Sequence, residues 1–140
     1  MQLSQILNGV SVNGGYDQFA EIEDIIYDSR KGRANTLFVC LSGARFDGHT
    51  FAKSAYDNGC RVFLCEKEVS LPSDAKVILC ENTRAALAVC SANFFSHPSK
   101  EIAVIGITGT KGKTTVAHIV KYVLEAAGLK CGIIGTIGAK

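Results

Sequence analysis

A glycine-rich loop at residues 106–114 places the strongest constraint on how this chain can fold. It reads GITGTKGKT and matches the pattern G-x-x-x-x-G-K-[ST] in full. The run EIAVIGI at 101–107 leads into it and predicts a strand buried on both faces. Apolar residues recur at helical spacing over 116–127, which predicts a helix that ends at Gly128. With KCGIIG at 130–135 as a parallel return strand, the sequence predicts one βαβ unit.

The spacing of the loop suits a polyphosphate ligand. Several backbone N–H groups can converge on phosphate oxygens only where side-chain bulk is absent, as at Gly109 and Gly112. The first amides and the positive dipole end of the following helix face the same anion. Lys113 adds a positive charge for the β- and γ-phosphates, and the Thr114 hydroxyl can ligate the Mg²⁺ that bridges them. We therefore predict binding of a nucleoside triphosphate, in preference to a glycine-rich turn in an unrelated βαβ unit.

The residues before the loop form a separate part. We predict a first domain over 1–97 and the incomplete beginning of a second over 98–140, because the polar stretch SHPSK contains a proline that ends a helix. Within the first domain, β-branched and aromatic runs predict strands, and helical spacing predicts helices, in this order: strands 22–27 and 37–41, a helix from Phe51 to Asn58, strands 61–65 and 76–80, and a helix capped by Asn82 or Thr83. This alternation predicts an α/β layer arrangement for the first domain.

Composition and charge exclude several classes of function. The net charge is +2 and no dense Lys/Arg stripe is present, so we expect no nucleic-acid partner. No apolar run approaches the ~20 residues that span a bilayer, and the first residues lack a signal-peptide pattern, so we expect a cytoplasmic protein without a membrane span. The six cysteines lie mostly in apolar runs and never form C-x-x-C, which favours buried thiols over metal ligands or disulfides. The oligomeric state cannot be read from the sequence.

The loop and three other segments resemble the Mur ligases, the ATP-dependent ligases of bacterial peptidoglycan synthesis. The loop GITGTKGKTT at 106–115 resembles the G-x-T-G-T-x-G-K-T-T of that family. DSR at 28–30 resembles its D-S-R signature, and LFVCLSG at 37–43 with DGHTF at 47–51 resembles its L-F-V-A-L-x-G…D-G-H-x-F segment. GTIG at 135–138 is similar to the G-T-I-G of the family members that add the third amino acid. The members that add D-Ala-D-Ala are the alternative.

The resemblance implies two binding regions, one in each domain, for different ligands. The first domain is expected to be a small α/β domain that holds the UDP end of a UDP-N-acetylmuramoyl-peptide. The second is expected to be the start of a P-loop ATPase domain with a mainly parallel sheet. The residues implied for UDP are Tyr27, Ser29, Ala44, Arg45 and Phe46. Those implied for ATP are Gly109, Thr110, Lys111, Gly112, Lys113, Thr114 and Thr115, with Lys113 as the catalytic residue and Thr114 as the ligand of Mg²⁺.

The implied reaction passes the γ-phosphoryl group to the D-Glu carboxylate and then lets the amine of an incoming amino acid attack the acyl phosphate. The family's second Mg²⁺ ligand, its carbamylated lysine and its amino-acid pocket are expected beyond residue 140. We therefore expect a fragment without ligase turnover, and the identity of the added amino acid stays open.

The residues alone also allow other interpretations. Asp28 and Arg30 can form a simple ion pair across a turn, His49 is expected to be structural, and the role of Lys111 is undecided. Another P-loop enzyme, or a nucleotide- or UDP-sugar-binding module without catalysis, remains as an alternative function.

Overall fold

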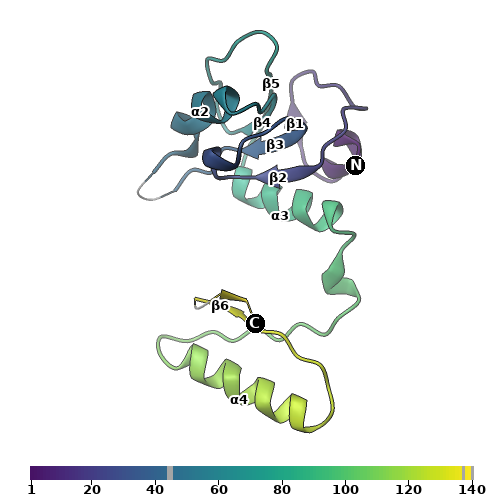
Figure 1. Cartoon of the computed structure of the whole chain (residues 1–140), viewed down its shortest axis with the longest axis vertical. Coiled ribbons are helices and arrows are strands. Elements are labelled where there is room, and N and C mark those ends of the chain that lie inside the picture. The colour runs from purple at the N-terminus through teal and green to yellow at the C-terminus, as the bar shows by residue number, and fades with distance from the viewer. Residues whose placement is uncertain (44–45, 137, 140) are drawn as a thin grey trace. The chain divides into compact units, whose positions relative to one another are not determined.

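The computed structural model describes residues 1–43, 46–136 and 138–139, and Figure 1 traces the chain. The chain divides into two compact units, Met1–Glu101 and Ile102–Lys140. The division lies a few residues beyond His97, after the 3-10 turn η3 (Pro98–Lys100). Among the described residues, no helix combines the length and the apolar character needed to cross a membrane.

A five-stranded sheet forms the centre of the first unit, with strand order β1-β5-β4-β3-β2. Its strands are β1 (Val12–Asn13), β2 (Asp24–Ile26), β3 (Thr36–Val39), β4 (Val62–Cys65) and β5 (Lys76–Cys80). Strands β2 to β5 pair in parallel, and β1 joins β5 in antiparallel orientation at the edge. The predicted α/β fold is therefore confirmed for this unit, together with its four predicted strands, and the structure adds that its sheet is mainly parallel.

Helices cover both faces of this sheet (Figure 1). They are α1 (Leu3–Ile6), α2 (Ala52–Asp57) and α3 (Thr83–Phe94), and the 3-10 turns η1 (Ser29–Lys31) and η2 (Gly48–Phe51) connect other parts. Because successive strand residues point to opposite faces, Leu37 and Val39 pack in the cluster that includes residues of α1 and α3. Phe38 packs on the other face with residues of α2. All of β3 is buried, as expected of a central strand covered on both sides.

Short polar side chains begin three of the helical elements. The Asn82 side chain accepts a hydrogen bond from the Ala85 N–H at 2.9 Å, which makes Asn82 the N-cap of α3. Asp28 accepts from the Arg30 N–H at 3.1 Å at the start of η1. Asp47 accepts from the His49 N–H at 3.0 Å at the start of η2. These caps fix where the chain turns after leaving the sheet, and two of them lie beside the candidate site.

The second unit corrects part of the prediction. Helix α4 (Lys113–Ala126) is present and is followed by Gly128 with φ +81°, as expected. Residues 101–107, however, form no strand, and the apolar side chains of Ile102 and Val104 are exposed. The predicted parallel return strand is also wrong, because β6 (Ile134–Gly135) pairs in antiparallel orientation with β7 (Gly138–Ala139).

The physical reason for this difference is the lack of cover. A strand buried on both faces needs neighbouring strands and a helical layer on each side. The described residues of the second unit provide one helix and a short hairpin, and none of them is buried. The predicted βαβ unit is therefore not formed here, although its helix is.

Candidate functional site

The glycine-rich loop leads directly into α4, and two of its glycines have backbone conformations that suit glycine. Gly112 is the N-cap of α4 with φ +76°, and Gly109 has φ +152°. A Cβ atom at Gly109 would lie 3.6 Å from the Lys111 carbonyl oxygen, an ordinary contact. The backbone conformation, and not a shortage of space, is therefore what requires glycine at these positions.

Hydrogen-bond donors gather at this end of α4. The first helical bond described runs from the Val116 N–H to the Gly112 carbonyl at 2.9 Å, so the preceding amides of the first turn are available for an anion. The Lys113 Nζ atom donates to the Gly109 carbonyl oxygen at 2.6 Å, which holds the ammonium group over the loop. All the residues implied for ATP, from Gly109 to Thr115, are exposed. Backbone amides, an ammonium group and the Thr114 hydroxyl together fit the chemistry of a triphosphate with Mg²⁺.

A second candidate region is an open pocket of about 630 Å³ in the first unit. It lies just past the carboxyl end of β2, the edge of a parallel sheet where ligands commonly bind. Two residues implied for UDP, Tyr27 and Ser29, line it together. The Tyr27 ring is 66% exposed, whereas Ser29 is largely buried. The remaining lining residues are Asp28, Arg30, Phe51 and Ser54.

An ion pair forms one wall of this pocket. The Arg30 guanidinium donates from Nε to Asp28 Oδ1 at 2.9 Å and from one terminal nitrogen to Oδ2 at 2.7 Å. These hydrogen bonds lower the pKa of Asp28 to about 2. The ion pair across a turn that the residues allowed is thus present, and the same guanidinium also lines the pocket.

Phe46, the one other residue implied for UDP that the structure describes, is not brought into the pocket. Phe46 is 72% exposed and is not among the lining residues. Ala44 and Arg45 lie outside the described residues. Phe51 and Ser54, which were not predicted as site residues, line the pocket from the end of η2 and from α2. Their separation of three residues is the signal that would have found them, because such positions share one helix face.

The DGH segment beside the pocket is tied to the sheet by His49. The Nδ1 atom of His49 lies 2.6 Å from Asp47 Oδ1, and Nε2 accepts a hydrogen bond from the Glu66 N–H at 2.9 Å. The Asp47 carboxylate also pairs with Lys67 at 2.6 Å, and hydrogen bonds from Lys67 and His49 hold its pKa well below the usual range. His49 is buried and joins η2 to the residue that follows β4, in agreement with a structural role.

Comparison with known sequences identifies related proteins. Residues 21–109 match the model described as "Mur ligase family, catalytic domain". The chain is 46% identical over 140 residues to UDP-N-acetylmuramoyl-L-alanyl-D-glutamate--2,6-diaminopimelate ligase of Clostridium botulinum, a match that covers 98% of this chain and 29% of that protein. It is 39% identical over 143 residues to the protein of the same name from Syntrophomonas wolfei, covering 100% and 29%. The chain therefore spans less than a third of the length of these relatives.

Solved structures share its fold. MurF from Acinetobacter baumannii aligns with a TM-score of 0.69 and 27% identity, covering 89% of this chain and 27% of that chain. A structure of UDP-N-acetylmuramoyl-L-alanyl-D-glutamate 2,6-diaminopimelate ligase aligns with a TM-score of 0.71 over 100% of this chain and 28% of that one, and its 19% identity supports the fold alone. The family match spans more than half of the sequence. The chain belongs to the Mur ligase family.

Proposed function

We propose that this chain carries the UDP-binding region and the ATP phosphate loop of a cytoplasmic, ATP-dependent ligase that adds the third amino acid to UDP-N-acetylmuramoyl-L-Ala-D-Glu. The observation that carries the proposal is the loop at 106–115, which opens α4 with its lysine folded over it. Relatives of 39–46% identity with third-residue ligase names support the assignment. Because the chain spans less than a third of those relatives, the complete reaction is proposed for the whole protein, and we expect no turnover from these 140 residues.

In the proposed reaction the loop binds ATP and offsets charge. Backbone amides at the start of α4 bind phosphate oxygens, and the Lys113 ammonium leaves the Gly109 carbonyl to compensate charge on the transferred phosphoryl group. Mg²⁺, with the Thr114 hydroxyl among its ligands, would neutralise further phosphate charge. The D-Glu carboxylate takes the γ-phosphoryl group of ATP to form an acyl phosphate, and ADP is the leaving group. The amine of the incoming amino acid then attacks, so that an amide forms and phosphate leaves.

The pocket at the end of β2 is proposed to hold the uridine end of the substrate. The rings of Tyr27 and Phe51 offer apolar faces to a planar base. The hydroxyl groups of Ser29 and Ser54 offer hydrogen bonds to the polar edge of the uracil or to the ribose. The Arg30 guanidinium supplies positive charge next to a ligand that carries a diphosphate.

The names of the relatives favour 2,6-diaminopimelate as the added amino acid. The Clostridium botulinum and Syntrophomonas wolfei proteins carry that name at 46% and 39% identity. The alternative, addition of D-Ala-D-Ala, is supported by the MurF structures at a lower identity of 27%. The higher identity and the GTIG segment at 135–138 both favour the third-residue ligase.

Calorimetric titration of the 140-residue chain tests the two binding regions separately. MgATP and UDP are each expected to bind at one site, and saturation with one should not prevent binding of the other. A chain with a native circular dichroism spectrum that binds neither ligand would overturn the proposal. Binding of MgATP without UDP would favour a different P-loop enzyme, because the first unit would then lack its proposed ligand.

A further inference from the structure

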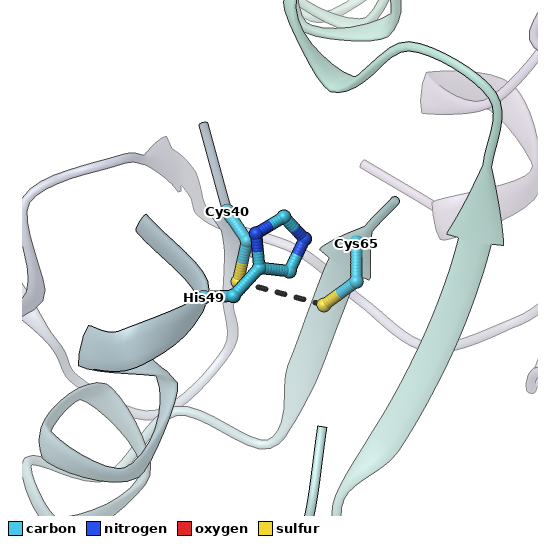
Figure 2. Close-up of side chains that lie close together, drawn as sticks. All are labelled: Cys40, His49 and Cys65. Atoms are coloured by element: carbon cyan, nitrogen blue, oxygen red, sulfur yellow. Dashed lines mark hydrogen bonds between the residues drawn. The ribbon is translucent and has the colours of Figure 1, made fainter. Parts of the chain in front are cut away.

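Two buried thiols and a buried imidazole meet at the carboxyl ends of β3 and β4, and none of them lines the Tyr27 pocket. Cys40 follows β3 and Cys65 ends β4. The register pairs Val39 with Leu64, so these cysteines are the next neighbours along the two parallel strands. Their sulfur atoms lie 3.5 Å apart, and Figure 2 shows the His49 ring beside both.

Hydrogen bonds hold the His49 ring in place. His49 belongs to η2, and its side chain is 3% exposed. One possible ligand atom from each of Cys40, His49 and Cys65 lies within 4.8 Å of the others. Asp47 accepts at His49 Nδ1 and is paired with Lys67, so Nδ1 carries the proton. The Nε2 atom accepts the Glu66 N–H at 2.9 Å, so Nε2 is the unprotonated nitrogen and its lone pair is aimed at that amide. A carboxylate on the far nitrogen is the arrangement that orients a metal-binding histidine.

We propose that Cys40, Cys65 and His49 form a binding site for a thiophilic divalent cation of the zinc class. Two cysteines and one histidine are an established zinc ligand set, with the fourth position left to water. Two Zn–S bonds of about 2.3 Å at a tetrahedral angle hold their sulfur atoms roughly 3.8 Å apart. The observed separation of 3.5 Å is close to this value, so the strands need only a small adjustment.

The charge balance suits a buried site. The ion displaces one proton from each thiol: M²⁺ + 2 Cys–SH + His → M(Cys–S⁻)₂(His) + 2 H⁺. Two neutral thiols and a neutral imidazole have no net charge, and the product has none either. A divalent cation therefore enters without leaving an uncompensated charge among apolar residues.

One existing contact opposes metal binding. The lone pair of His49 Nε2 has to leave the Glu66 N–H, so this amide loses its acceptor. We therefore expect a weaker affinity than that of closed four-cysteine sites. No local pattern predicts this group, because its cysteines are 25 positions apart and only the strand register brings them together.

Cobalt(II) titration tests the site, since cobalt takes the place of zinc and absorbs light when thiolates bind it. The whole 140-residue chain is used, reduced and freed of metal, with Cys131→Ser to remove a half-buried thiol. We expect one cobalt ion per chain with thiolate charge-transfer absorption, release of two protons per ion, and displacement by one equivalent of zinc. A chain with a native circular dichroism spectrum and no such absorption would overturn the proposal.

Variants separate this site from unspecific binding by thiols. Cys40→Ser and Cys65→Ser are each expected to lose the charge-transfer absorption, whereas Cys90→Ser, a buried cysteine in the cluster on the other face of the sheet, should keep it. Asp47→Asn keeps an oxygen for the cap of η2 and removes the charge that partners His49 and Lys67, outside the buried core, so it remains informative if a core variant fails to fold. It should weaken zinc binding about 10- to 100-fold. The site is contradicted if Asp47→Asn binds zinc as tightly as the wild type, or if Cys90→Ser loses as much charge-transfer absorption as Cys40→Ser and Cys65→Ser. Neither result bears on the proposed ligase function.

Discussion

Lys113→Met removes the ammonium group over the phosphate loop and keeps a side chain of similar length. In the structure its Nζ donates to the Gly109 carbonyl oxygen at 2.6 Å, so a bound triphosphate has to compete for this donor. Both bonds involve the charged ammonium group, and such hydrogen bonds contribute about 1.5–3 kcal/mol. A neutral carbonyl acceptor belongs near the lower end of this range and an anionic phosphate near its upper end, so the exchange favours binding by about 1–1.5 kcal/mol. Losing it should weaken MgATP binding roughly five- to twelvefold.

Calorimetric titration of MgATP into both proteins measures this ratio. Since the loop is exposed, the ratio should shrink at about 1 M salt, where the screening length falls to about 3 Å. Lys100→Met removes an exposed lysine of η3 and is the matched charge control, for which we expect wild-type affinity. If Lys113→Met is folded and binds MgATP as tightly as Lys100→Met at low salt, the Lys113 ammonium group has no part in triphosphate binding, which contradicts its proposed role.

Three further predictions concern the pocket, the core and one carboxylate. Tyr27→Ala should weaken UDP binding by about 1–3 kcal/mol, the contribution of one base–aromatic stack, whereas Phe19→Ala, which removes another exposed ring, should leave the calorimetric affinity unchanged. Phe63→Ala should lower the free energy of unfolding in urea by about 3–5 kcal/mol, and Tyr122→Ala, at a residue 74% exposed, should change it by less than about 0.5 kcal/mol. The lowered pKa of Asp28 stabilises the folded state at pH values above 3.8, the ordinary pKa of this carboxyl group. This contribution is lost as the pH falls towards 2. The stability difference between wild type and Asp28→Asn should therefore shrink between pH 4 and pH 2 in thermal unfolding, and a constant difference would contradict the assignment.

The sequence predicted the elements whose signals are local. Thr36–Val39 and Lys76–Cys80 are short apolar runs between turns, and Asn82 carries its own capping chemistry, so both strands and the helix start were found. The run at 101–107 has the same apolar character and is not a strand here. A run that is apolar on both sides forms a strand only where other strands and helices pack against both of its faces. Whether they do depends on residues elsewhere in the protein.

The site was predictable to the same extent. The resemblance to the Mur ligases led to Tyr27 and Ser29, which line one pocket, and motif spacing led to the loop that Lys113 closes. Phe51 was missed because its place in the pocket depends on how the 3-10 turn η2 continues into α2. The meeting of Cys40 with its neighbouring thiol depends on the register of two parallel strands, which no local pattern encodes.

The two proposed binding regions differ in how many buried residues support them. Tyr27 and Ser29 follow a strand of a sheet covered on both faces, and the Asp28 cap fixes the turn between them. The phosphate loop belongs to a unit in which no described residue is buried, and the apolar side chains of Val116 and Ile119 on α4 are exposed. A site on a well-packed scaffold loses little conformational entropy when its ligand binds, whereas a loop with few buried contacts has to be ordered at that moment. The affinity for ATP should therefore depend on whether the apolar face of α4 is covered, and the affinity for UDP should not.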